Sequence, residues 1–345
     1  MHTQLLDILV DPVTREPLQA QPSDSKEGEI LQGILTAPSG VNYQIRDGVP
    51  RFVRPEEQED TARSFGYKWG RQGAYESDHY VDMIARDEVP RWGLQSLDEF
   101  HDIFRKRSRI LDAGCGSGHF ASIYVNERKG GQWVGTDLSS AIDIARARLK
   151  EVPGTEFVQA NLLQLPYRDE SFDFVLCRGV MHHTPSTHAA FTSLVRVLQP
   201  RGEFMFLIYR RMGPIREFTD EFIRNHISKL APDEGWAALE SLTKLGKSLA
   251  ELHVDVDVPE DIPYLGIPAG KHDLQSLFYY HFVKAYWNPE LSFDTNQHNT
   301  FDWYHPPFAF HHTEEEIESW CHSAGMKVVF LKAMETSWAV RAIKQ

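Results

Sequence analysis

The sequence predicts an α/β fold whose sheet binds a ligand at the carboxyl ends of its strands. An apolar run over residues 109–113 leads into three glycines at alternate positions, Gly114, Gly116 and Gly118. This pattern is typical of a buried strand that turns sharply into a helix, where the backbone is too crowded for side chains. A second short strand ends in Asp137, an acid placed to hold the two hydroxyls of a ribose. These observations predict a nucleoside cofactor, whose anionic group meets backbone N–H groups at the start of the helix.

Composition narrows the class of protein. The chain has 345 residues, enough for one large domain and a small one, and its net charge of −13 argues against a broad contact with nucleic acid. No apolar run approaches the length of a membrane span, and the acid-bearing N-terminal segment lacks a secretory pattern. Three cysteines are too few and too scattered for a disulfide framework or a metal cluster. We therefore expect a cytoplasmic protein that contacts neither nucleic acid nor a membrane.

The glycine spacing distinguishes two kinds of nucleoside site. A dinucleotide fingerprint, G-x-G-x-x-G, would need a glycine where His119 stands. The acid-x-G-x-G-x-G order that begins at Asp112 resembles instead the first motif of class I S-adenosylmethionine-dependent methyltransferases. Residues 161–167, 171–177 and 198–203 are similar to that family's adenine-contacting loop, fourth strand and turn into the fifth strand. The resemblance implies a Rossmann-like, seven-stranded methyltransferase sheet and S-adenosyl-L-methionine as the cofactor.

The resemblance also implies which residues contact the cofactor. They are Asp112, Gly114, Gly116, Gly118, Asp137, Leu138, Asn161, Leu162, Cys177 and Arg178. Asn161 departs from the family, in which many members have Asp, but its carbonyl can accept the same hydrogen bond from the adenine amino group. Ahead of the glycines, Tyr67 and Trp69 are expected to lay aromatic faces over the cationic sulfonium. The alternative for these two aromatics is a hydrophobic anchor between domains.

Residues 1–55 form a separate β-rich unit in the sequence. They resemble the small zinc-ribbon domain of Trm112-like proteins, in which two Cys-Pro-x-Cys knuckles hold one zinc. The four ligand positions correspond here to Asp11, Thr14, Ala37 and Gly40, none of which is a thiolate. We therefore expect no metal, and a unit that serves as a structural lid or, alternatively, as a docking module.

The rest of the chain divides into two parts. Residues 56–108 are predicted to form a linker and a helical lid over the cofactor, and residues 109–345 the methyltransferase domain. Within that domain, residues 210–312 exceed what a minimal methyltransferase needs and begin at helical spacing, so we expect a helical insert after strand five that caps the substrate. The alternative for the insert is a homodimer interface. The expected substrate contacts in it are Tyr279, Tyr280, His281 and His305.

Adjacent histidines follow the fourth strand, beside the expected position of the methyl group. His182 and His183 are the candidate catalytic residues, because a histidine with a pKa near neutrality can take a proton from an attacking hydroxyl or amine. The alternative is structural, with one imidazole capping the next turn and the other buried. Later histidines lack a metal-binding spacing and are expected to be isolated or to cap turns: His298, His305, His311 and His312.

Taken together, the motifs predict an S-adenosylmethionine-dependent methyltransferase that acts on an O or N atom of a small molecule. A sugar or a natural-product intermediate is the first expectation for that acceptor. The Trm112-like segment keeps open an enzyme that methylates protein or RNA, although the acidic charge and the aromatic insert count against it. A third alternative is a non-catalytic partner subunit that keeps the methyltransferase fold. The intact glycine motif and Asp137 count against that alternative.

Overall fold

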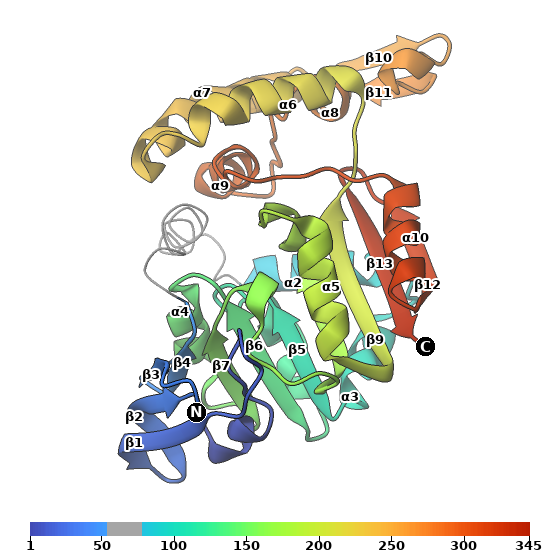
Figure 1. Ribbon diagram of the computed structural model, residues 1–345. Coiled ribbons are helices and arrows are strands. Elements are labelled where there is room, and N and C mark those ends of the chain that lie inside the picture. Colours follow the sequence, from blue (N-terminus) through green and yellow to red (C-terminus); the bar gives the residue numbers. More distant parts are fainter. Residues whose placement is uncertain (54–77) are drawn as a thin grey trace.

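A single large sheet organises the protein. The computed structural model describes residues 1–53 and 78–345. Within these residues an eleven-stranded sheet has the order β1-β2-β3-β4-β7-β6-β5-β8-β9-β13-β12 (Figure 1). The N-terminal strands are β1 (Gln19–Lys26), β2 (Glu29–Thr36), β3 (Asn42–Arg46) and β4 (Val49–Arg51). The others are β5 (Arg109–Ala113), β6 (Gln132–Asp137), β7 (Thr155–Gln159), β8 (Phe172–Arg178), β9 (Leu198–Tyr209), β12 (Met326–Ala333) and β13 (Ser337–Lys344).

The five strands β5 to β9 are parallel, so their carboxyl ends share one edge of the sheet. β5 pairs with both β6 and β8, and the order reverses at β5, where the first and fourth strands of the core lie side by side. Open α/β sheets bind ligands at such a reversal. β13 runs antiparallel between β9 and β12, and the α/β sheet has eleven strands in the described residues, where the resemblance implied seven.

Helices cover both faces of the parallel strands, which are therefore apolar on both sides. Neighbouring residues Ile110 and Leu111 of β5 are both fully buried, in two different apolar clusters. One face packs against α5 (Thr187–Val197) and α10 (Glu314–Ser323), and the other against α3 (Leu97–Arg105) and α4 (Ala141–Leu149). α2 (Asp78–Arg91) packs on α3.

The small N-terminal unit is continuous with the main sheet rather than a sheet of its own. β4 joins β7 in parallel at the pair Arg51 and Gln159, and the Phe52 N–H donates to the Gln159 carbonyl at 2.8 Å. The guanidinium of Arg51 also meets Asp143 of α4 at 2.5 Å. The boundary that the sequence suggests near residue 55 therefore separates two segments of the sequence but not two sheets. Strands from both segments belong to one hydrogen-bonded sheet.

The insert after β9 lies beyond the edge at which the parallel strands end (Figure 1). Its expected helical beginning is present as α6 (Pro214–Ile227) and α7 (Pro232–Ala250), followed by α8 (Leu274–His281) and α9 (Phe293–Tyr304). Between α7 and α8, a two-stranded hairpin of β10 (Asp255–Val258) and β11 (Gly270–Asp273) interrupts the helices, which the spacing of apolar residues did not predict. In the described part of the chain, no helix is both long and apolar enough to cross a membrane.

The predicted helix directly after the glycines is absent, and this expectation was wrong. The chain forms two short 3-10 helices there, Phe120–Ile123 and Val125–Glu127. The Ser122 hydroxyl donates to the His119 carbonyl, and the β-branched residues Ile123 and Val125 follow, so local bonding and stiff side chains oppose a longer helix. Tyr124 between them is pulled inward, where its hydroxyl donates to Asp112 at 2.6 Å.

Candidate active site

The glycine loop has a backbone conformation that requires glycine. Gly114, Gly116 and Gly118 all have positive φ values, of 78°, 56° and 71°. A Cβ on Gly114 would lie 2.4 Å from a methyl carbon of Val180, and the Gly114 N–H donates to the Thr136 carbonyl at 2.7 Å. The loop is thereby held close to β6, with bare backbone along the edge of the sheet.

Asp137 ties the end of β6 to this loop. Its Oδ2 accepts the Gly116 N–H at 2.8 Å, and its Oδ1 accepts both the backbone N–H and the hydroxyl of Ser139. The carboxylate is fixed at the carboxyl end of its strand, where the sequence places the ribose. Leu138 follows at the same edge, and its carbonyl accepts the Gln159 side-chain amide.

Asp112 is buried at the end of β5, and its charge depends on its surroundings. Its Oδ2 accepts the Tyr124 hydroxyl, which in turn accepts the Trp133 indole N–H at 3.1 Å. Burial raises the pKa of Asp112 to about 7, against the effect of the Tyr124 hydrogen bond, which lowers it. A positive group brought to this carboxyl would favour its ionised form.

Asp112→Asn is expected to flatten the pH dependence of stability. Because the folded pKa lies above the ordinary value of 3.8, the contribution of Asp112 to stability is complete below that value and is lost as the pH rises through about 7. The free energy of unfolding should therefore fall more steeply in the native protein than in Asp112→Asn between about pH 5 and pH 8. Urea unfolding at both pH values measures this, and equal slopes would contradict the assignment. The amide oxygen of Asn still accepts the Tyr124 hydroxyl, so the hydrogen-bond network is preserved.

The residues that the resemblance assigns to the adenine side follow β7. Asn161 is the N-cap of a 3-10 turn at Leu162–Gln164, and its Oδ1 accepts the Leu163 N–H at 3.0 Å. Leu162 is buried in the apolar cluster beneath. Cys177 is also fully buried in this cluster, and burial raises the pKa of its thiol. A cofactor at the strand end would therefore contact the backbone of Cys177 and not its side chain. Tyr67 and Trp69 lie outside the residues that the structure describes.

Arg178, at the end of β8, is held by a residue that the sequence did not identify. Its guanidinium donates twice to Oε1 of Glu88 on α2, at 3.0 and 3.2 Å, and lies over the Phe120 ring. Glu88 is fully buried, and it also meets Arg91 at 3.0 Å and accepts the Trp92 indole N–H at 2.7 Å. Glu88 lies in a stretch of alternating acids and bases, which gives no local sign of burial.

The two histidines after β8 anchor the neighbouring backbone. His182 and His183 are both buried in a 3-10 turn, Met181–His183. The Tyr209 N–H donates to Nδ1 of His182 at 3.3 Å, and Nδ1 of His183 lies 2.7 Å from the Phe308 carbonyl. A carbonyl only accepts, so Nδ1 of His183 carries a hydrogen, whereas Nδ1 of His182 holds the lone pair. Burial, followed by the charge of His183, lowers the pKa of His182 well below its usual range, so His182 is neutral.

A strap over residues 308–312 runs beside this turn and the end of β9. The Phe310 N–H donates to the His182 carbonyl at 3.0 Å, and the His312 N–H donates to the Tyr209 carbonyl at 3.0 Å. Arg210 and His312 form a parallel bridge, so the strap extends the sheet where β9 ends. His311 projects from the strap against the rings of Tyr209 and Trp303.

The predicted substrate contacts do not all gather at one place. Tyr279 lies next to the Arg216 guanidinium in the insert core, and the Tyr280 ring packs edge-on against the Tyr279 ring. His281 ends α8 and is partly buried. His305 instead stacks on Phe301, and its Nε2 faces the Leu230 carbonyl at 3.3 Å. The structure thus brings Tyr279 and Tyr280 together and leaves His305 in the packing between α7 and α9.

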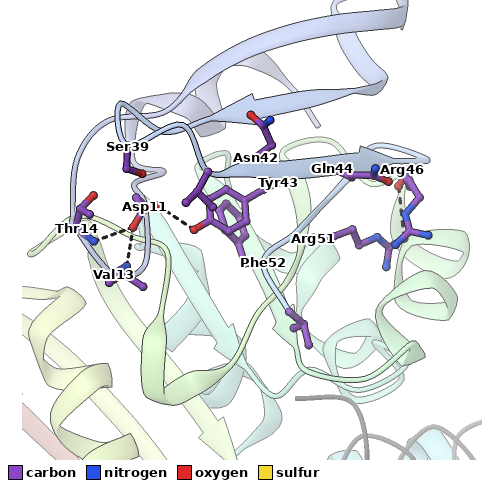
Figure 2. A pocket seen from close by; sticks show the side chains of 12 residues that line it. Asp11, Val13, Thr14, Ser39, Asn42, Tyr43, Gln44, Arg46, Arg51 and Phe52 are labelled. Carbon is purple, nitrogen blue, oxygen red and sulfur yellow. Dashed lines mark hydrogen bonds between the residues drawn. The ribbon is translucent and has the colours of Figure 1, made fainter. Parts of the chain in front are cut away.

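The N-terminal unit keeps two tight turns at the positions of the expected knuckles. Oδ1 of Asp11 accepts the N–H groups of Val13 and Thr14, and Oδ2 accepts the Tyr43 hydroxyl (Figure 2). Burial alone would raise the pKa of Asp11. These hydrogen bonds outweigh burial, and the pKa is lowered. The Gly40 N–H closes the second turn on the Ala37 carbonyl at 2.9 Å. Both turns line a pocket of about 680 Å³, and no cluster of metal-ligating side chains occurs among the described residues.

The strand order places the glycine loop where an open α/β sheet reverses its order, and comparison shows which proteins this arrangement resembles. Residues 111–206 match the model of the methyltransferase domain family. A fatty-acid O-methyltransferase of Mycolicibacterium smegmatis is 35% identical over 40% of this chain and 51% of its own length. A phthiotriol/phenolphthiotriol dimycocerosates methyltransferase of Mycobacterium ulcerans is 26% identical over 57% of this chain and 74% of its own. Residues 111–206 are therefore similar to a methyltransferase domain.

One solved structure shows a weaker similarity. A 1,6-didemethyltoxoflavin-N1-methyltransferase of Burkholderia thailandensis, solved with 1,6-didemethyltoxoflavin and S-adenosylhomocysteine, has a TM-score of 0.45 and 13% identity over 95% of this chain and 99% of its own. Among the curated relatives, the match to the fatty-acid enzyme spans only about half of that enzyme.

Proposed function

We propose that this protein transfers the methyl group of S-adenosyl-L-methionine to an O or N atom of a small organic molecule. The observation that carries the proposal is the junction between the glycine loop and β6, where the Gly116 N–H meets the Asp137 carboxylate. When bound, the cofactor supplies an electrophilic methyl group on a cationic sulfur. The glycine loop, Asp112 and Asp137 would hold it, with Leu138, Asn161 and Leu162 on the adenine side.

The residues fit such a group in charge and space. A Cβ on Gly179, at the end of β8, would meet no atom within 4 Å among the described residues, so these residues leave room beside the strand end. The buried carboxyl of Asp112 would gain its ionised form beside the positive amino group of the cofactor. In a direct displacement, alignment of the nucleophile, the methyl carbon and the sulfur supplies most of the rate enhancement.

A small acceptor is favoured over protein or RNA. The described helices of the insert lie over the strand ends, and the net charge of −13 is unfavourable for a nucleic-acid substrate (Figure 1). The relative named as a fatty-acid O-methyltransferase adds apolar acceptors to the first expectation of a sugar or natural-product intermediate. The N-terminal unit, with its Trm112-like turns, is proposed as a structural lid without metal.

Asp137→Ala is expected to weaken the binding of S-adenosylhomocysteine by about 2–3 kcal/mol, because it removes a charged hydrogen-bond acceptor. Calorimetry measures the affinity. Asp143→Ala is the matched control, since this acid at the start of α4 is half exposed and pairs with Arg51 away from the loop. Unchanged affinity in a folded Asp137→Ala protein would refute the site.

The reaction itself is tested with cofactor labelled in the methyl group. The native protein is incubated with fractionated cell metabolites, and with alcohols, phenols, amines and carboxylic acids. Label is expected to appear in an organic fraction and to be reduced with Asp137→Ala. Binding of S-adenosylhomocysteine without transfer to any acceptor would favour the non-catalytic alternative.

A further inference from the structure

A carboxylate and an imidazole form a second feature of the site that the sequence did not predict as a pair. Nδ1 of His311 lies 2.9 Å from both carboxylate oxygens of Glu217, which stands in the first turn of α6. The His311 side chain is 5% exposed. Glu217 also accepts the Met212 N–H at 2.6 Å, so its position is fixed from both sides.

Glu217 remains a carboxylate in this arrangement. Burial alone would raise the pKa of Glu217, but the His311 hydrogen bond and the nearby charges outweigh it, and the pKa is lowered. An ionised carboxylate only accepts hydrogen bonds, so Nδ1 of His311 carries the hydrogen. In the neutral imidazole, Nε2 then holds the lone pair.

Nε2 of His311 is buried and has no hydrogen-bond partner among the described residues. Leaving such an atom unsatisfied is unfavourable, and a ligand that donates a hydrogen bond to it would remove that cost. His182 has the complementary deficiency. Its Nδ1 is engaged by Tyr209, and its buried Nε2, which carries the hydrogen, also lacks a partner in the described part of the chain. One unsatisfied acceptor and one unsatisfied donor therefore remain.

Both imidazoles lie against the same tyrosine at the end of β9. His182 stacks on the Tyr209 ring at 3.7 Å between centroids, and His311 packs edge-on against it at 5.7 Å. A hydroxyl group has the chemistry that satisfies both atoms, because it accepts one hydrogen bond and donates another. A carboxylate can accept from His182 but has no hydrogen to give to His311.

We propose that His311 is the general base of the methyl transfer, oriented by Glu217, and that the acceptor is a hydroxyl group rather than a carboxylate. This inference rests on the proposed function. As the acceptor oxygen bonds to the methyl carbon, the bond from that carbon to the sulfonium sulfur breaks and its electron pair stays on sulfur. The hydroxyl proton passes to Nε2 of His311, and Glu217 stabilises the resulting imidazolium. A carboxylate acceptor is already ionised near neutral pH and needs no base.

The first test needs no acceptor. Nitrogen NMR of the protein labelled in histidine reports which ring nitrogen carries the hydrogen. The proposal expects His311 with hydrogen on Nδ1 and none on Nε2, and a weakened preference in Glu217→Gln. His226→Gln is the matched control, because His226 is an exposed histidine of the same helix that bonds to the Phe222 carbonyl. Hydrogen on Nε2 of His311 in the native protein would overturn the proposal.

The second test uses matched acceptor probes: a long-chain alcohol against the fatty acid of equal length, and a phenol against benzoic acid. Label is expected in the hydroxyl compounds. His311→Ala should lower turnover by about 10²–10⁴-fold, with recovery on adding imidazole, and unchanged affinity for S-adenosylhomocysteine. Glu217→Gln should lower turnover with the same probes, and His226→Gln should not.

Two results would overturn the assignment of the base. One is transfer to carboxylates alone. The other is normal turnover in His311→Ala while His182→Ala or His183→Ala loses turnover, which would return the role to the histidines after β8. Absence of S-adenosylhomocysteine binding and of any transfer would refute the proposed function instead, and the NMR result would still decide whether the His311 pair exists.

Discussion

Asp220→Ala is expected to lower the free energy of unfolding by about 3–5 kcal/mol, because it leaves a buried guanidinium uncompensated. Asp220 and Arg216 are both fully buried one helical turn apart on α6, and Nε of Arg216 donates to Oδ2 of Asp220 at 2.8 Å. The same carboxylate accepts the Trp303 indole N–H and the Tyr304 hydroxyl, each at 2.7 Å. One side chain therefore joins α6 to α9.

Urea unfolding of the native protein and the variant measures this loss. Glu221→Ala, at the next position on the same helix but exposed, is the control and should change the free energy by less than about 0.5 kcal/mol. Limited proteolysis should cut Asp220→Ala first within the insert. A loss below about 1 kcal/mol would mean that the Arg216 charge finds another partner or reaches water.

Glu88→Ala is the second large effect, with an expected loss of about 3 kcal/mol in the free energy of unfolding. Glu88 is fully buried and pairs with Arg91 and Arg178, whose side chains are 20% and 29% exposed. Because both cations keep some access to water, the loss should fall at the low end of the range for a broken buried pair. The variant should also weaken binding of S-adenosylhomocysteine, since Arg178 at the end of β8 loses its anchor.

Asp87→Ala is the matched control for Glu88, because it removes an acid from the adjacent, exposed position of α2. Thermal and urea unfolding, followed by calorimetry with S-adenosylhomocysteine, separate the two consequences. If Glu88→Ala unfolds like Asp87→Ala, the bonds from Glu88 to the two arginines contribute no stability.

The parts of the fold that the sequence predicts are those encoded by neighbouring residues. The alternate glycines and the apolar run before them report a strand and a crowded turn, and Asp137 reports the end of the next strand. These signals depend on local backbone geometry, which one segment specifies by itself.

The features that were not predicted depend on residues far apart in the chain. Glu88 meets Arg178 and Glu217 meets His311 only after the sheet has formed, and neither acid differs locally from a solvated one. The short 3-10 turns after the glycines have the same cause, because Tyr124 is drawn to Asp112 by a buried hydrogen bond. The continuity of β4 with β7 is a pairing across residues 51 and 159 that no local pattern encodes.

That continuity has a consequence for solubility. A parallel core of this kind would end at β7, whose unpaired backbone groups could recruit the strand of another molecule. Here β4 occupies the edge at Gln159, and the His2 N–H reaches the Glu156 carboxylate at 3.1 Å farther along the same strand. The N-terminal unit thus makes β7 an interior strand of the sheet instead of an edge strand. Residues 1–53 move the exposed edge of the sheet to β1, where Pro22 and a β-bulge oppose pairing with the strand of another molecule.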